Sequence, residues 1–239
     1  MSWQFDEVAH AGPEHLNPAY VAAFDIKAKT DWSEEIATLL ALGIGPASTI
    51  VDFGAGTGTF AEAIAGRVAR VVSVDISPAM VATMQARGLE AIRAGFLSYE
   101  HTGEPPDAIF SSNALHHLPD FWKAIALQRI ARLLRPGGVL RLSDIIYSFE
   151  ADGADQAIAA WLATASDDRS RGWTASELAA VIRHEHATFT WLLEPMLQHA
   201  GLEIRDRWIS DNQTFAAYSC VLPQSPRNFS ANRAAPYSA

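Results

Sequence analysis

The sequence has little cysteine, no long apolar run and fewer basic than acidic residues. Its one cysteine, Cys220, cannot form an internal disulfide, and its place in the apolar run 215–222 predicts a packing residue. No stretch is apolar over the roughly 20 residues that a membrane-spanning helix needs. The opening residues, Met1 to Glu7, lack the basic start and apolar core of a signal peptide. We therefore expect a cytoplasmic protein that has no membrane partner.

The acidic balance also limits the partners. The chain of 239 residues carries 18 Lys and Arg against 27 Asp and Glu, a formal net charge of -9. Such a surface repels a phosphate backbone, so a small-molecule substrate is expected as the partner and nucleic acid is not. Hydrophobic residues make up 49% and charged residues 19%, which indicates an ordinary globular chain. Nothing in the sequence specifies an oligomeric state.

From residue 49 to 143, short apolar runs alternate with amphipathic stretches. The runs predict strands at 50–53, 71–75, 89–93, 108–111 and 139–143. Helix start signals, such as Ser77-Pro78, stand between them. Strands that alternate with helices form a parallel sheet covered on both faces. The pattern therefore predicts a doubly wound α/β fold.

Further helices and strands are expected on both sides of this core. Asn17-Pro18 and Ser33 start two N-terminal helices, and residues 151–201 lose the strand rhythm. That insertion predicts helices at 154–163, 175–186 and 190–200, followed by strands at 202–209 and 215–222. We expect one domain over 1–222, made of a helical lid (1–45), a core (46–150), the helical insertion (151–201) and the final strands (202–222), and a flexible tail over 223–239.

The strongest local signal is the segment 51–60, in which a strand ends at glycines and a helix follows. Gly54, Gly56 and Gly58 let a ligand approach the backbone closely and meet the amides of the helix N-terminus. A dinucleotide site would need its last glycine where Thr59 stands. Asp52 ends an otherwise apolar strand, and a buried carboxylate is costly unless it meets a cation or several donors. The segment therefore favours a ligand with a cationic end.

In these residues the sequence resembles the class I S-adenosylmethionine-dependent methyltransferases, whose first motif is an acid, an apolar residue and Gly-x-Gly-x-Gly. Asp75 ends the next strand, where the family places an acid on the ribose hydroxyls. The resemblance continues through 111–119 and the turn 133–138 and covers roughly residues 49–145. It implies an enzyme that binds S-adenosylmethionine on the core 46–150. It also implies a Rossmann-like sheet of seven mostly parallel strands, with the last strand antiparallel.

The resemblance also implies a set of cofactor contacts, with one departure. The acid that many relatives carry after the third strand is absent from the segment 95–97, so adenine is expected on the backbone there, with Ser98 or Glu100 as a substitute. Ile76 and Met80 would either pack on adenine or simply join helix to sheet. The predicted cofactor-binding residues are Asp52, Gly54, Gly56, Gly58, Thr59, Asp75, Ile76, Met80, Gly95, Phe96, Leu97, Asn113, Ala114 and Tyr20.

Three residues are candidates for catalysis. Methyl transfer from a sulfonium needs alignment and exclusion of water, and it needs a base only where the accepting atom must lose a proton. His116 and His117 follow the fourth strand, at the edge where ligands bind in such sheets, and either could be that base. Alternatively, the pair packs the next helix. Asp144 ends the fifth strand and either orients a substrate or terminates the strand.

No metal site is expected, because His184 and His186, on either side of Glu185, would lie on different faces of a helix. Aromatic residues of the lid and the insertion can close over a sulfonium by cation–π contact, while others among them pack the core. The candidates are Tyr20, Phe24, Trp32, Trp161, Trp173, Phe189 and Trp191.

Four functions are compatible with these patterns. A methyltransferase acting on a small molecule is favoured. An enzyme of the same fold that cyclises or cleaves the cofactor without methylating an acceptor is the alternative. A nicotinamide-dependent oxidoreductase is disfavoured by Asp52 and Thr59, and a non-catalytic cofactor-binding protein would bind without turnover. The sequence does not specify the acceptor or the accepting atom.

Overall fold

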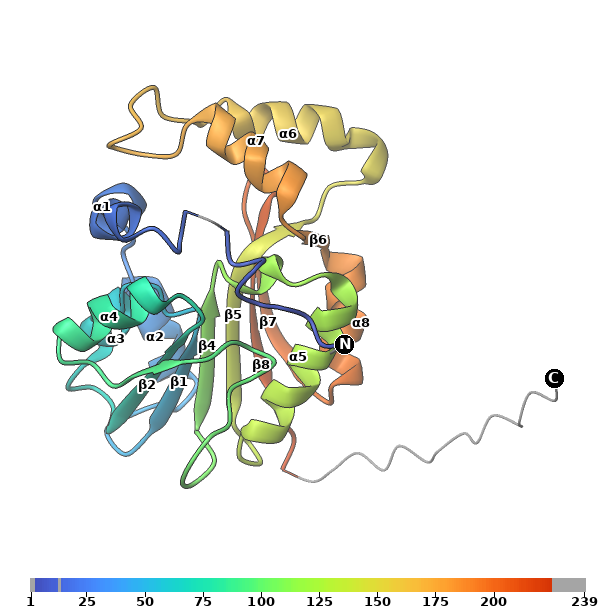
Figure 1. The fold of residues 1–239 in the computed structure, drawn as a ribbon. Helices are drawn as coiled ribbons and strands as arrows, with labels where there is room; N and C mark the ends of the chain where they lie inside the picture. Colours follow the sequence, from blue (N-terminus) through green and yellow to red (C-terminus); the bar gives the residue numbers. More distant parts are fainter. Residues whose placement is uncertain (1–2, 13, 225–239) are drawn as a thin grey trace, which may run out of the picture.

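The computed structural model describes residues 3–12 and 14–224, so the tail predicted for 223–239 lies almost entirely outside the described residues. Its centre is one mixed sheet in the order β3-β2-β1-β4-β5-β8-β7 (Figure 1). The predicted fold class is confirmed, including the antiparallel pairing of β8 with β5 and β7. The strands are β1 (Thr49–Phe53), β2 (Arg70–Asp75), β3 (Ala91–Arg93), β4 (Ala108–Ser112), β5 (Val139–Tyr147), β7 (Glu203–Ile209) and β8 (Phe215–Val221).

The helices cover both faces of the sheet because the side chains of its buried strands alternate in direction. In β1, Ile50 joins a core with Leu39 of α2 and Phe60 of α3. Its neighbour Val51 joins the opposite core, with Leu127 of α5. The helices are α1 (Pro18–Ala28), α2 (Ser33–Ala41), α3 (Thr59–Ile64), α4 (Pro78–Ala86), α5 (Asp120–Leu133), α6 (Ala154–Leu162), α7 (Ala175–His184) and α8 (Thr190–His199), with short 3₁₀ turns η1 (Leu115–His117) and η2 (Ala151–Gly153).

Polar caps set the start of the helices that matter for the site. The Asn17 side chain accepts from the Ala19 amide at 2.9 Å and starts α1, and Ser77 caps α4 ahead of Pro78. At α7, Thr174 and Glu177 bond each other's backbone amides in a capping box. Among the described residues, none of the helices combines the length and apolar character that crossing a bilayer requires.

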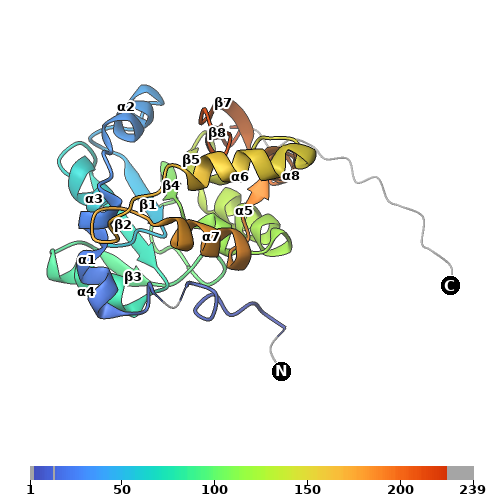
Figure 2. The same cartoon turned by 90° about the horizontal axis from the view of Figure 1, so that it is seen from above.

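The insertion predicted at 151–201 divides between two parts of the molecule. Helices α6 and α7 lie over the edge of the sheet where the parallel strands end (Figures 1 and 2). Trp161 of α6 belongs to a small core that these two helices form with Tyr147 of β5. Helix α8 instead packs into the main core through Leu193 and Leu197. Between them runs β6 (Thr188–Phe189), which pairs in parallel with β5 and is an eighth strand that the sequence pattern did not predict.

Candidate active site

A cavity of about 910 Å³ lies at the carboxyl edge of the sheet. One side of it is the turn after β1, the ends of β2 and β3 and the turn after β4. The other side is α1, α6 and α7 together with the segment before α1. The cavity therefore joins the part of the chain that carries the predicted cofactor motif to the N-terminal lid and the insertion.

The glycines after β1 have two different tasks. Gly54 has a φ of 70°, and a Cβ there would lie 2.2 Å from the Ala114 Cβ, so the turn after β1 can touch the turn after β4 only at a glycine. Gly56 lines the cavity. Gly58 does not line it: a Cβ at this position would meet Leu89 at 2.3 Å, so this glycine allows close packing with the chain that follows α4.

Asp52 is buried without a full set of partners. Its side chain faces the cavity with 2% of the residue exposed, and its Oδ2 has no hydrogen-bond partner within the described ranges. Burial, and then the nearby charge of Asp75, raise the pKa of the Asp52 carboxyl well above its usual range. A cationic ligand group beside this carboxylate would relieve both effects. The site therefore fits the cationic methionine end of S-adenosylmethionine.

Asp75 at the end of β2 is held by the backbone. Its Oδ2 accepts from the Gly56 amide at 2.9 Å and its Oδ1 from the Ser77 amide at 2.8 Å. Burial raises the pKa of Asp75 to about 6, although these two amides oppose the shift. The carboxylate lines the cavity with further acceptor capacity, which is the chemistry that ribose hydroxyls require.

Two of the three residues predicted at 95–97 line the cavity. Gly95 and Phe96 line the cavity, with Phe96 stacked on Phe53 at 5.1 Å between ring centroids. Leu97 does not line it, because its side chain packs against the core cluster. Ile76 and Met80 also face this part of the cavity.

A carboxylate from a distant part of the chain lies beside this segment. The Leu97 amide donates to both carboxylate oxygens of Glu7, at 3.3 and 3.2 Å, and the Ser98 hydroxyl donates to Oε2 of Glu7 at 3.3 Å. Burial raises the pKa of Glu7 while these donors oppose the shift. Glu100, one of the predicted substitutes, instead pairs with Arg129 at 2.8 Å. Glu7 is a residue that sequence reasoning missed, since 90 positions separate it from Leu97.

The remaining predicted cofactor residues also line the cavity. Asn113 adopts a left-handed backbone with a φ of 51°, and its amide donates to the Ser143 carbonyl at 2.9 Å. Thr59 accepts from the Trp32 indole at 3.1 Å. The Tyr20 hydroxyl is buried and has no hydrogen-bond partner in the part of the chain that the structure describes. Ala114 lines the cavity beside Asn113.

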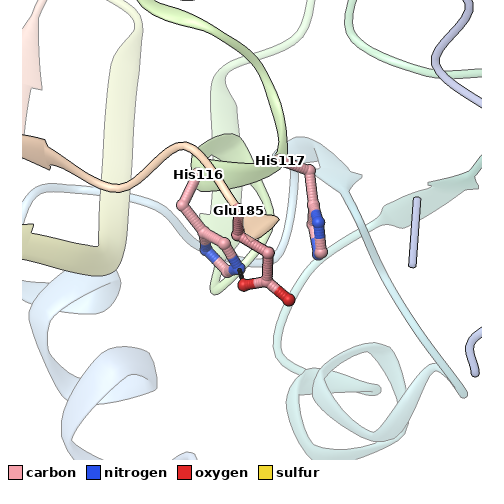
Figure 3. A group of neighbouring side chains, drawn as sticks. All are labelled: His116, His117 and Glu185. Carbon is pink, nitrogen blue, oxygen red and sulfur yellow. Dashed lines mark ion pairs between the residues drawn. The ribbon is translucent and has the colours of Figure 1, made fainter. Parts of the chain in front are cut away.

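The three catalytic candidates belong to one cluster. Asp144 Oδ1 contacts His116 Nδ1, and Asp144 Oδ2 accepts from the His116 amide at 3.1 Å. The other ring nitrogen of His116, Nε2, lies 2.9 Å from Oε2 of Glu185 (Figure 3). Burial alone would lower the pKa of His116, but the two carboxylates outweigh it and raise the value to about 9. His116 is therefore an imidazolium fixed between two carboxylates.

His117 has a different environment. Its ring lies 4.4 Å from that of His116 and 5.8 Å from that of His15, between centroids. Its Nδ1 is buried and finds no hydrogen-bond partner among the residues described. Burial and then the charge of His116 lower the pKa of His117 to about 3, so this ring is neutral. Both histidines line the cavity, whereas Asp144 lies behind them.

Glu185 was not predicted as a site residue. Helix α7 ends at His184, and the chain then turns into an extended conformation that leads to β6. The His186 amide donates to the His116 carbonyl at 2.8 Å, which fixes this segment beside η1. The sequence interpretation, which continued the helix to His186, therefore separated residues that the structure brings together.

The predicted aromatic surface is found in most of its members. Tyr20, Phe24, Trp32, Trp161 and Trp173 line the cavity. The other two, Phe189 and Trp191, stack on each other at 5.4 Å outside it, and Trp191 is 59% exposed.

The comparisons with known proteins agree with this geometry. A family described as a methyltransferase domain matches residues 50–138. An uncharacterized methyltransferase of Geobacillus kaustophilus is 30% identical over 155 residues, which are 64% of this chain and 67% of the relative. An uncharacterized methyltransferase of Oceanobacillus iheyensis is 27% identical over 100 residues, which are 41% of this chain and 47% of the relative.

Solved structures show the same fold at low sequence identity. The N-methyltransferase NodS of Bradyrhizobium japonicum, in complex with S-adenosylhomocysteine, has a TM-score of 0.54 at 18% identity, with 80% of this chain and 86% of NodS covered. The [4+2]-cyclase SpnF has a TM-score of 0.59 at 15% identity, with 83% and 85% covered. The chain belongs to the class I S-adenosylmethionine-dependent methyltransferases. It is an enzyme whose cofactor is S-adenosylmethionine.

Proposed function

We propose that this enzyme methylates a small, largely apolar molecule that binds in the outer half of the cavity, beneath α7. The observation that carries the proposal is the continuity of one cavity from Asp52 and Asp75 to the aromatic walls of α6 and α7. Ligand cavities in proteins commonly measure roughly 300–1,000 Å³. At about 910 Å³, this one has room for a second, compact molecule beside the cofactor.

The walls of the outer half favour an apolar acceptor. Trp161, Trp173, Leu178, Val181 and Phe215 line it. Apolar walls with a few polar groups are typical of small-molecule sites, where the polar groups set the orientation. Here the polar groups are those of the cluster at η1 together with Glu177 and His184 of α7.

The chain's own residues would hold the cofactor and exclude water. Asp52 would face the methionine end, and Asp75 would accept from the ribose hydroxyls. Glu7, Gly95 and Phe96 would border adenine. The cofactor supplies a methyl group already activated by the sulfonium, so the protein's work is alignment and desolvation. Tyr20 and Phe24 of α1 and Trp173 before α7 close the space above these residues.

The three catalytic candidates differ in what they can contact. Asp144 and His116 hold each other, and the second ring nitrogen of His116 faces Glu185, so both act as positioning residues. His117 lines the cavity with an unpartnered Nδ1. We infer that His117 is the residue through which the cluster acts on the acceptor.

The decisive experiment follows the cofactor's products. The protein is incubated with S-adenosylmethionine and a panel of aromatic phenols, amines and carboxylic acids, and the mixtures are analysed by mass spectrometry. Formation of S-adenosylhomocysteine, with an acceptor that has exchanged a hydrogen for a methyl group, supports the proposal. Methylthioadenosine, or loss of cofactor without a methylated product, would instead support the cyclising or cleaving alternative.

A tryptophan pair tests where the acceptor binds. Trp173→Ala is expected to raise the KM for the acceptor several-fold because it removes part of the cavity wall. Trp191→Ala removes an exposed tryptophan outside the cavity and is the matched control. Equal effects of the two substitutions on KM would overturn the placement beneath α7.

A further inference from the structure

We propose that His116, His117 and Glu185 form a binding site for a divalent transition-metal ion at the acceptor end of the cavity. The three residues each offer one ligand atom, and these atoms all lie within 4.8 Å of one another. Figure 3 shows the three side chains converging from η1 and from the end of α7. Only the ion's contact with an acceptor rests on the proposed function, because ion binding needs nothing but these side chains.

The spacing suits a single ion after small side-chain movements. Two ligands of a tetrahedral ion with bonds of about 2.1 Å stand about 3.4 Å apart. The widest separation, up to 4.8 Å, therefore needs side-chain movements of about 1 Å. The 2.9 Å between His116 Nε2 and Glu185 Oε2 would give an angle of roughly 90° at an ion with such bonds. An ion here would take the place of the proton between these two atoms.

Asp144 prepares His116 for this task. A histidine that binds metal through one ring nitrogen usually donates the other N–H to a carboxylate, which fixes the ring. Asp144 contacts Nδ1 of His116 and leaves Nε2 directed at Glu185. Asp144 is itself fixed, since it accepts from the backbone amides of His116 at 3.1 Å and Ile145 at 2.7 Å.

An unsatisfied polar atom provides a second indication of a ligand. His117 Nδ1 is buried without a hydrogen-bond partner among the described residues, although it lies in the same cluster as the His116–Glu185 ion pair. A buried polar atom left without a partner costs free energy that an ion would offset. An ion bound between His117 and the His116–Glu185 pair would give this nitrogen its partner.

The ligand chemistry indicates the class of ion. Two imidazoles and one carboxylate suit zinc, iron(II), nickel or cobalt, whereas magnesium prefers a shell of oxygen atoms. Three protein ligands leave positions open toward the cavity. An ion there would polarise an acceptor oxygen or nitrogen and favour its deprotonated form, which is the nucleophile in methyl transfer.

Calorimetry on the full chain tests the site directly. Protein freed of metals with a chelator is titrated with ZnCl₂ and, separately, with MgCl₂. We expect one equivalent of Zn²⁺ to bind much more tightly than Mg²⁺. His117→Gln and Glu185→Gln should each weaken Zn²⁺ binding at least tenfold, and Co²⁺ should give a visible absorption band that both substitutions remove.

The control is His184→Gln, which changes an exposed histidine next to Glu185 and should leave Zn²⁺ binding unchanged. Thermal unfolding checks that each variant is folded. No Zn²⁺ binding, or binding that persists in both His117→Gln and Glu185→Gln, overturns the metal site. Affinity for S-adenosylhomocysteine is measured on the same samples, so that failure of the metal site is separate from failure of the methyltransferase proposal.

Discussion

Lys27 of α1 and Glu177 of α7 are 150 positions apart in the sequence and form an ion pair of 2.6 Å between the two helices. The ammonium of Lys27 also lies 4.3 Å from the centre of the Trp173 ring, in cation–π geometry. Both helices line the cavity, so this pair joins two of its walls.

Loss of this ion pair should loosen the contact between α1 and α7 above the cavity. Lys27→Met keeps the aliphatic stem but removes the charge, and the side chain is only 7% exposed in the protein. We expect dissociation of S-adenosylhomocysteine, followed by stopped-flow tryptophan fluorescence, to accelerate by roughly fivefold, on the order of 1 kcal/mol for one partly buried pair. Arg169 contacts the same Glu177 from solvent and is 77% exposed, so Arg169→Met should leave the rate almost unchanged. Similar rates in the two variants would refute the role of Lys27.

Ribose recognition by Asp75 should depend on pH. The ionised carboxylate is the better acceptor for hydroxyl groups, and burial raises the pKa of Asp75 to about 6. Affinity for S-adenosylhomocysteine should therefore be constant above this value and fall as the pH decreases through 6. Asp75→Ala should weaken binding at pH 8 by ~1–3 kcal/mol and remove this part of the pH dependence. Calorimetry at a series of pH values measures both effects, and unchanged affinity in the variant would contradict the assignment.

Asp52 should matter for binding more than for folding. Its folded pKa is raised, so above that value the ionised group opposes folding, and Asp52→Asn removes this cost while keeping the shape. The melting temperature of the ligand-free variant should not fall. The increase in melting temperature on adding S-adenosylmethionine should shrink, because the cation loses its carboxylate. A variant that unfolds at lower temperature would show that Asp52 is a structural residue.

The contact between the first and fourth strand turns can be tested by a pair of substitutions. Gly54→Ala would place a Cβ 2.2 Å from that of Ala114 at a positive φ, so we expect a loss of about 1–3 kcal/mol in the free energy of unfolding. Ala114→Gly removes the opposing Cβ and should restore part of this loss in the double variant. Urea denaturation measures all three proteins. Additive effects of the two substitutions would show that the close approach is not the cause.

The cofactor half of the site could be predicted because its signals are local in sequence. Asp52 and Asp75 lie at the ends of two successive strands and the glycines follow the first, so the strand-turn-helix pattern alone brought them to one edge. Gly58 shows the limit of that reasoning. It shares the motif with Gly54 and Gly56, but its neighbours Met84 and Leu89 belong to α4 and the chain beyond it, and they make it a packing glycine.

The residues that were missed depend on contacts between distant parts of the chain. Glu7 reaches Leu97 from an irregular segment with no periodic pattern. Glu185 faces His116 only because α7 stops at His184 and a two-residue strand follows. Such a strand is too short to leave an apolar run in the sequence. A helix that continues to His186 was therefore the better prediction from local sequence.

The short strand β6 limits how helix α7 can move over the cavity. Its Thr188 pairs with Ile146 of β5, and the His186 amide is bonded to the His116 carbonyl, so the carboxyl end of α7 is anchored to the sheet. The opposite end follows the exposed stretch 167–171 and is held to α1 mainly through side chains. Helix α7 is therefore attached to the sheet at its carboxyl end, beside Glu185, and to α1 at its other end, through the ion pair with Lys27. Substrates would enter and spent cofactor would leave beside Lys27, while the groups around Glu185 would keep their positions throughout the cycle.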